Sequence, residues 1–481
     1  MLVRRVLSAS FYRGGTSKGL ILDAFRLARY PQASRDRLIL QAMGSPDPDR
    51  RQIDGLGGGI SSLSKVAIVG KLPSFSLIEQ LGPEFHLPIS EKARGIIRDK
   101  QRSRDWDVVY VFGQVPVHGS ERIDWSSTCG NLISSVALFS IDQGIVEQTL
   151  LNQRFFEATS SPQADLDVVR MEVAVKLLIA ASGQIVRVHV PVIDANPDKF
   201  FWLPELEGDT SIAGVPGKAP AIKIEAPLEN SGDVKVLSTG NERDEIELDG
   251  KKIPVTVINA GLPTIFVTCR SLNLSPEDLD VPPSTMDSNV ELMSKLESIR
   301  QKVCQLNPFL SSTSSPSAPK ICIVAPPTDY TTTGGEKIYS NSFDLLVRAI
   351  SVGNVHRTIP ATALSALAVS RAFSNSNTSE EPIPQHRQDE NKLRLIHLTV
   401  GQPAGLSSSS VKVNTETSEP ESTIYVRTAR LLIKGLLEFL WDSARMDADG
   451  KLTKDQMEKI KYKPPKKSKR KGKDGHEEPV L

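Results

Sequence analysis

The chain has 481 residues, 39% of them hydrophobic and 24% charged, so it is long enough for two globular domains with sizeable apolar cores. Its net charge is +1, and eight basic residues with no acidic residue lie in 461–473. The rest is therefore slightly acidic, which argues against a nucleic-acid-binding face in the folded body. Four cysteines without a CxxC spacing and seven histidines without ligand spacing argue against a structural metal site or a disulfide framework.

The chain shows no membrane or secretion signal. No run of about 20 apolar residues could span a bilayer, and the first 15 residues lack the apolar core of a signal peptide. We therefore expect a cytoplasmic protein with reduced thiols and no membrane partner. The basic segment 461–473 resembles a nuclear-import signal, although a solvated tail is the alternative interpretation.

The N-terminal half predicts strands around a buried helix. Two strands flank the loop RGGTSKG, residues 13–19, and a short helix is expected over 33–43. A second Gly-rich loop, 53–64, leads into the apolar run KVAIVG, and 106–118 alternates as strands do. The segment after Cys129 has almost no polar face, which predicts a buried helix that ends near Gly144.

Further strands are expected in 168–192 and 220–270, where β-branched residues alternate. The stretch between them, 194–220, has the composition of a linker. We therefore predict a domain of residues 1–215 and a second of 216–441.

The second half predicts a similar order of elements. A strand over 320–327 is followed by a Gly turn, a helix over 343–350, and a second buried helix within 352–373. The pair Gly353-Asn354 introduces that helix as Gly130-Asn131 introduces the first, which indicates two related domains, although GN is also a common turn dipeptide.

The end of the second half predicts loops and one more helix. Ser-rich segments at 310–319, 374–392 and 406–422 are expected to be mobile surface loops. A helix over 428–441 should close the body, and 442–481 is predicted to be a polar, basic, disordered tail.

The loop 13–19 is a candidate carboxylate site. It is not a P-loop, because its last glycine, Gly19, is not followed by Lys and Ser or Thr. It does offer backbone N–H groups, the hydroxyls of Thr16 and Ser17, and the cations Arg13 and Lys18, a set that suits carboxylates. An ordinary turn between strands is the equally good alternative.

Three further side chains are candidates for chemistry. Lys65 stands alone at the start of an apolar run, where burial would lower its pKa and make it a base; an exposed strand-edge lysine is the alternative. Cys129 precedes a helix, whose N-terminus stabilises a thiolate or a bound carboxylate; a small buried cysteine is the alternative. His356 lies before the second buried helix, and if the two halves are related it would face the same cleft as Cys129; a capping residue at the protein surface is the alternative.

Taken together, the segments resemble the PrpF family of 2-methylaconitate isomerases, within the diaminopimelate epimerase-like superfamily. The resemblance covers residues 8–440. It runs through FYRGGTSKG, IDGLGGGISSLSKVAIV, CGN, GVPGKAPAIKIE, INAGLPTIFV, IVAPPTDY, DLLVRAISVGNVHRTIP and RTARLLIKG. It implies an α+β fold of two pseudo-symmetric domains, each a curved, mostly antiparallel sheet wrapped around a central helix, with the active site between them. It also implies no cofactor and no metal.

The resemblance implies an isomerase that shifts a proton, with double-bond migration or cis–trans isomerisation, in an aconitate-like tricarboxylate. Lys65 is the implied acid/base and Cys129 descends from the epimerase thiol. The segment 351–373 has no second cysteine, so a one-base shift is expected. Gln402 stands where many relatives have histidine, which bears on substrate choice. Substrate-binding residues are assigned to both halves of the chain: Arg13, Thr16, Ser17, Lys18, Ser64, Gly130, Asn131, Thr264, Gly353 and His356.

Three functions remain open from the sequence. The first is the aconitate-type isomerase, the second an oxalomesaconate-type keto–enol tautomerase, and the third a catalytically silent binding member of the family. The expected partner is a small polycarboxylate, and a homodimer is possible.

Overall fold

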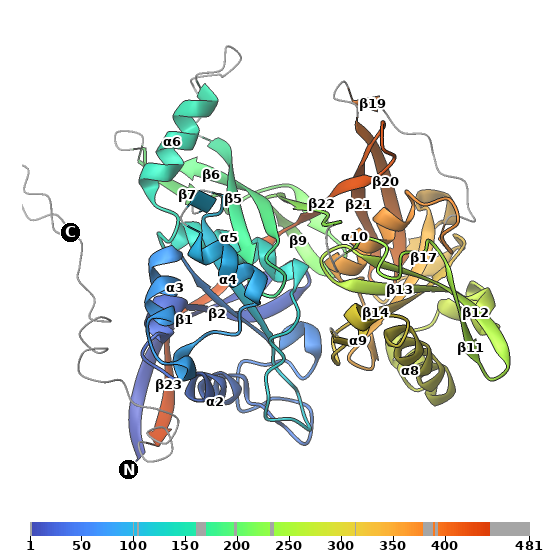
Figure 1. Ribbon diagram of the computed structural model, residues 1–481, viewed down its shortest axis with the longest axis horizontal. Coiled ribbons are helices and arrows are strands. Elements are labelled where there is room, and N and C mark those ends of the chain that lie inside the picture. Colours follow the sequence, from blue (N-terminus) through green and yellow to red (C-terminus); the bar gives the residue numbers. More distant parts are fainter. Residues whose placement is uncertain are drawn as a thin grey trace, which may run out of the picture.

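The computed structural model describes residues 2–99, 101–102, 105–159, 170–196, 200–230, 235–312, 314–378, 388–389 and 393–442. Within them the chain forms two lobes, one on each side of Figure 1. Each lobe is a curved sheet around one central helix, so the predicted α+β architecture is confirmed. The predicted basic tail lies outside the described residues.

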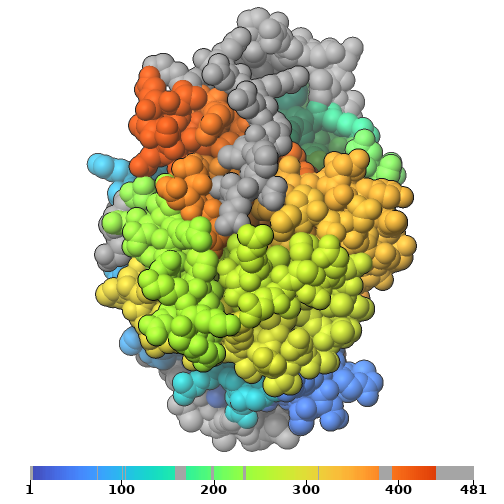
Figure 2. Space-filling view, turned by 90° about the vertical axis from the view of Figure 1, so that its right-hand side faces the viewer, coloured from blue at the N-terminus to red at the C-terminus, as the bar shows by residue number. Residues whose placement is uncertain are grey.

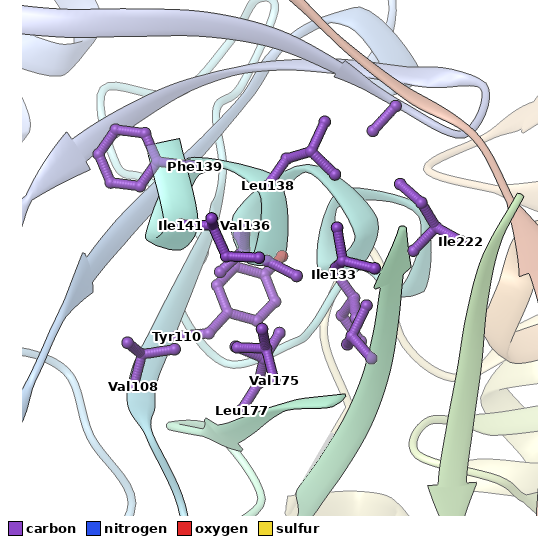
Figure 3. Close-up of a cluster of buried hydrophobic side chains, with 14 of the residues drawn as sticks. Val108, Tyr110, Ile133, Val136, Leu138, Phe139, Ile141, Val175, Leu177 and Ile222 are labelled. Atoms are coloured by element: carbon purple, nitrogen blue, oxygen red, sulfur yellow. The ribbon is translucent and has the colours of Figure 1, made fainter. Parts of the chain in front are cut away.

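In the N-terminal lobe the sheet wraps around helix α5 (Gly130–Asp142), in which every residue up to Ile141 is buried. The pairs β2–β3 and β4–β5 are parallel and the other pairs between consecutive strands are antiparallel. Figure 3 shows Ile133 and Val136 of the helix among Tyr110, Val175 and Leu177 of the sheet. A helix that is buried on all sides, with only small or amide polar side chains among its apolar ones, is stable when surrounded in this way. The strands of this lobe are β1 (Leu2–Gly14), β2 (Ser17–Asp23), β3 (Lys65–Gly70), β4 (Val108–Gln114), β5 (Arg170–Ile179) and β6 (Ile185–Asp194).

In the C-terminal lobe the sheet wraps around helix α10 (Ala361–Ser370), which is buried along its whole length. The pairs β13–β14 and β17–β20 are parallel, and the others are antiparallel. Figure 2 shows the outer face of this lobe, formed largely by residues from the second half of the chain. Its main strands are β12 (Lys251–Asn259), β13 (Pro263–Thr268), β14 (Lys320–Ala325), β17 (Leu345–Ser351), β20 (Leu393–Gln402) and β21 (Gly405–Asn414).

The remaining elements cover the sheets or extend them. The helices are α1 (Ala24–Leu27), α2 (Gln32–Met43), α3 (Leu72–Glu79), α4 (Glu91–Arg98), α6 (Gln148–Thr159), α7 (Pro283–Asp287), α8 (Val290–Cys304) and α9 (Pro308–Ser312). The strands are β7 (Trp202–Pro204), β8 (Thr210–Ile212), β9 (Val215–Ala219), β10 (Ile222–Pro227), β11 (Asp244–Leu248), β15 (Tyr330–Thr331), β16 (Lys337–Ile338), β18 (Asn354–Val355), β19 (Gln388–Asp389), β22 (Pro420–Arg427) and β23 (Ala429–Asp442).

The end of the chain returns to the N-terminal lobe. Strand β22 pairs with β10, which also pairs with β6, and β23 pairs with β1 along its whole length. The hydrophobic cores show the same return of the chain. Phe439 is buried in a core of the N-terminal lobe, whereas the buried residues of the C-terminal cores all lie between 236 and 413. The predicted division at residue 215 stays a prediction, but the last strand lies with the first.

Two predicted helices are wrong. Residues 343–350 belong to strand β17, and 428–441 to strand β23. Short apolar runs are ambiguous between helix and strand, because periodicity alone does not separate them. The Leu-rich sequence of β23 favours a helix by intrinsic propensity, but pairing with β1 over 13 register positions overrides that preference.

The predicted start of the second helix is also wrong. Val352 and Gly353 both have positive φ, 54° and 73°, and form the tight turn between β17 and β18. The helix begins seven residues later than Asn354, after Pro360. The GN pair is therefore a hairpin turn here, which was the plainer interpretation.

The predicted mobile loops are only partly loops. Residues 406–422 lie mostly in β21 and β22 and pair with each other. Ser317, within the predicted loop 310–319, is buried. Of the predicted loop 374–392, residues 379–387 and 390–392 lie outside the described residues. In the described part of the chain, no helix is both long and apolar enough to cross a bilayer.

Candidate active site between the lobes

A cavity of about 40 Å³ lies where the first turns of α5 and α10 meet. Both lobes line it with hydroxyl, amide and amine groups, and none of the described lining residues is Asp or Glu. The lining residues are Thr16, Ser17, Ser61, Ser62, Lys65, Phe112, Gln114, Ser127, Thr128, Cys129, Gly130, Asn131, Ser317, Lys320, Ser351, His356, Pro360, Ala361 and Thr362.

Lys65 is the first residue of β3 and is 8% exposed. Its Nζ donates a hydrogen bond of 2.6 Å to Oε1 of Gln114, the residue opposite it on β4. The Gln114 amide is held in that orientation because its Nε2 donates to the carbonyls of Ser61 and Ser64. Burial lowers the pKa of Lys65, and the nearby Cys129 opposes that shift. The prediction that Lys65 is buried and has a lowered pKa is therefore confirmed.

Lys320 is a second buried lysine, which sequence analysis did not identify. It is the first residue of β14 and is aligned with Thr264 of the parallel strand β13. Lys65 is aligned in the same way with Gly19 of the parallel strand β2. The two lysines therefore occupy equivalent positions in the two lobes. A signal was present, because each begins a strand of apolar and small residues, KVAIVG and KICIVA.

The electrostatics of Lys320 differ from those of an exposed lysine. Burial, reinforced by the positive charge of Lys65, lowers the pKa of Lys320 to about 8. Its Nζ donates to the carbonyl of Ser317 at 3.0 Å. Ser317 in turn donates to Asp124 at 2.7 Å and lies 3.1 Å from the hydroxyl of Ser127, so this chain of contacts joins the lobes beside the cavity.

His356 lines the cavity, as predicted, although it precedes α10 by five residues. It keeps some solvent exposure, but its Nε2 atom is buried and has no hydrogen-bond partner among the described residues. Burial and the charges of Lys65 and Lys320 lower the pKa of His356 to about 3. A neutral imidazole at neutral pH can hydrogen-bond a ligand but cannot act as a cationic acid.

Cys129 and Asn131 hold the N-terminus of α5 at the cavity. Cys129 occupies the N-cap position, and its Sγ lies 3.9 Å from the hydroxyl of Ser17. The Asn131 amide donates to Thr16 at 3.2 Å, and its Oδ1 accepts from Nε of the buried Arg427 at 2.8 Å. The RGGTSKG loop thus reaches the cavity through its two hydroxyls.

The two central helices approach each other closely at this point. A Cβ on Gly130 would lie 2.9 Å from the Cβ of Ala361. First-turn N–H groups of an α-helix have no partner within the helix, and the helix dipole adds positive potential there. Two such ends beside two lysines make a strongly anion-attracting cavity.

Five predicted binding residues do not line the cavity. Arg13 donates to the carbonyls of Gly15 and Thr428 instead. The hydroxyls of Ser64 and Thr264 bond to neighbouring protein groups, Gly353 is in a turn, and Lys18 does not reach the cavity. Their predicted role in binding stays a prediction.

Gln402 does not line the cavity either. Its side chain accepts a hydrogen bond from the backbone N–H of Ile359 and donates to Ser407. It therefore supports the segment that leads into α10, and any effect of this residue on substrate choice would act through that backbone.

Comparisons with known proteins agree on one family. The family described as "PrpF protein" matches residues 4–76 and 89–439. The chain is 29% identical to 2-methyl-aconitate isomerase of Shewanella oneidensis, with 90% of this chain and 96% of the relative covered. It is 30% identical to 4-oxalomesaconate tautomerase of Pseudomonas putida, with coverage of 88% and 94%. A crystal structure of methylitaconate-delta-isomerase has the same fold, at a TM-score of 0.61 and 24% identity over 92% of this chain and 97% of that one.

Proposed function

The chain belongs to the PrpF family, and from that premise and its cavity we propose that it is an isomerase of small unsaturated polycarboxylates. The observation that carries the proposal is the pair of buried lysines, Lys65 and Lys320, at one cavity without a lining carboxylate. Buried charges require counter-charges. A ligand with two or three carboxylates supplies them, and the two helix ends accept further oxygen atoms.

The proposed reaction is a proton shift across an allylic system in an aconitate-like tricarboxylate. The unprotonated form of Lys65, which burial favours, removes a proton from the carbon next to the double bond, and the C–H electrons move into the conjugated carboxylate. The same proton, or one from solvent, then returns at the other end of the system, which moves the double bond with no net gain or loss of atoms. Return at the original carbon after bond rotation gives the cis–trans isomer instead.

The charge that develops on the conjugated carboxylate needs fixed donors. The N–H groups of Gly130 and Asn131 at the start of α5 and the ammonium of Lys320 are suited to that role. Cys129 lies close enough to influence Lys65 electrostatically and is proposed as a second proton carrier or a wall of the pocket. The conjugated carboxylates themselves accept the electrons, so the proposed step requires neither a cofactor nor a metal.

The experiment is a proton-exchange assay in heavy water, followed by proton NMR and UV absorbance. Purified protein is incubated with cis-aconitate, trans-aconitate, 2-methylaconitate or 4-oxalomesaconate. Conversion of at least one of the first three, with deuterium incorporation, supports the proposal. Conversion of none of the four acids would sink it in favour of a binding role.

The base is tested with Lys65→Met on whichever acid is converted. We expect a loss of at least about a hundredfold in kcat, because general-base contributions are typically of that size or larger. The exposed Lys71 offers a matched control, since its side chain is 41% exposed and pairs with Glu147 away from the cavity. Full activity in the Lys65 variant would refute the assignment of the base.

A keto–enol tautomerase of oxalomesaconate type is the second candidate. It is favoured by the 30% identity to the Pseudomonas putida tautomerase. Conversion of 4-oxalomesaconate at a kcat/KM higher than that for every aconitate would select this reaction over the first.

A further inference from the structure

Among the described residues, strand β23 forms an edge of the N-terminal lobe with no further strand paired beyond it. It runs beside β1 at the lower left of Figure 1, and β1 is the only strand with which it pairs in the described part of the chain. An unpaired edge of this length exposes a row of backbone N–H and C=O groups that another strand can bind.

The middle of that edge is apolar. Residues 432–436 are all exposed, and Ile433 and Leu436 are 60% and 69% exposed. Val6, on the adjacent strand and opposite Glu438, is 51% exposed. Val6 and Leu436 lie on one face of the sheet and Ile433 on the other, so exposed apolar side chains flank the edge on both faces, and such side chains are a feature of protein–protein contact surfaces.

The charge pattern of the edge is complementary to itself. From Ile433 to Asp442 the strand pairs with β1 without a register shift, because its one bulge lies between the partners of Phe11 and Tyr12. Side chains alternate along such a strand, so Lys434, Leu436 and Glu438 lie on one face. In an antiparallel pair of two identical strands centred on Leu436, each Lys434 lies opposite the other copy's Glu438. The two Leu436 side chains then meet at the two-fold axis.

Other registers lack this match. A centre on Lys434 or on Glu438 places like charges directly opposite each other, and a centre on residue 435 or 437 places a charge opposite leucine. Opposite charges across antiparallel strands stabilise pairing and like charges disfavour it. The strand therefore specifies one symmetric register.

We propose that β23 pairs with β23 of a second copy of this chain, centred on Leu436, and joins two N-terminal sheets into one across a two-fold axis. Both charged groups have partners within their own chain: Lys434 lies 3.6 Å from the partly buried Asp142, and Glu438 pairs with the exposed Arg4. An exposed ion pair such as that of Glu438 contributes little, and the Lys434–Asp142 contact is long for an ion pair, so neither prevents pairing between copies. No residue of β23 lines the cavity between the lobes, so the contact leaves that cavity accessible.

The test is sedimentation velocity of the full chain over a range of micromolar concentrations. Wild type should sediment as a dimer. The charge reversal Lys434→Glu places glutamates opposite each other at both ends of the contact and should raise the dimer Kd by about tenfold or more. The double change Lys434→Glu with Glu438→Lys restores opposite charges in exchanged positions and should restore the dimer.

Leu436→Lys is the independent variant, because it places two like charges at the axis while changing a side chain that is exposed within one copy. Thermal unfolding followed by circular dichroism establishes that each variant is folded. A wild-type monomer at all concentrations, an unchanged Kd in Lys434→Glu, or failure of the double change to restore association would each overturn the proposal.

Discussion

Replacing Lys320 with methionine should stabilise the fold at neutral pH. The pKa of this lysine falls from 10.5 to about 8 on burial. At about 1.4 kcal/mol for each pKa unit, keeping it charged in the folded protein at pH 7 costs about 3 kcal/mol. Methionine removes that cost but leaves the carbonyl of Ser317 without its donor, a loss of about 1 kcal/mol. The expected net gain is about 2 kcal/mol.

The gain should depend on pH with a defined sign. Between pH 8 and 10.5 the unfolded chain keeps the Lys320 proton and the folded protein releases it, so wild-type stability rises with pH in this window. The advantage of Lys320→Met should therefore shrink by about 2 kcal/mol between pH 7 and 9.5. Substrate binding should weaken in the variant at both pH values, because a cation at the cavity is lost.

Urea unfolding at pH 7 and 9.5 measures both quantities. Lys252→Met is the matched control, since that side chain is 77% exposed, and its change should stay within about 0.5 kcal/mol at both pH values. A Lys320→Met variant less stable than wild type at pH 7, or one whose advantage does not shrink at pH 9.5, would refute the argument.

Three further changes test how the cavity is held together. Gly15→Ala places a Cβ 2.5 Å from the Asn131 side chain at a φ of +52°, so kcat should fall at least tenfold in the isomerase assay. Gly119→Ala is the matched control, because its φ is also positive, +71°, but its Cβ would meet open space. It should lose only about 1 kcal/mol of stability. Arg427→Lys removes the 2.8 Å bond to Asn131 and should lower kcat more than it raises KM; equal activity to wild type would count against a positioning role. Ser317→Ala breaks the buried contact between the lobes and should cost about 1–2 kcal/mol in urea unfolding; an unchanged midpoint would contradict this.

The sequence alone was enough to predict the elements whose local hydrophobic pattern is compatible with one kind of secondary structure. The segment after Cys129, which has little polar face, was predicted as a buried helix, and the glycine loop 13–19 between apolar runs as a turn between strands; both are confirmed. Lys65 was identified because it is a single charge at the start of an apolar run, but the sequence left an exposed strand-edge lysine as the alternative, and only the structure shows that it is buried. These conclusions depend on residues close together in the chain.

The tertiary structure decided what depends on distant partners. The segment 428–441 is a strand because β1, more than 400 residues away in the sequence, supplies its hydrogen bonds. Helix propensity depends on the segment alone and contains no information about that partner. Lys320 joins Lys65 because two strand pairs repeat the same parallel register in the two lobes, which no single segment reveals. Arg427 reaches Asn131 for the same reason, because the last strands of the chain return to the N-terminal lobe and bring this guanidinium beside the start of α5.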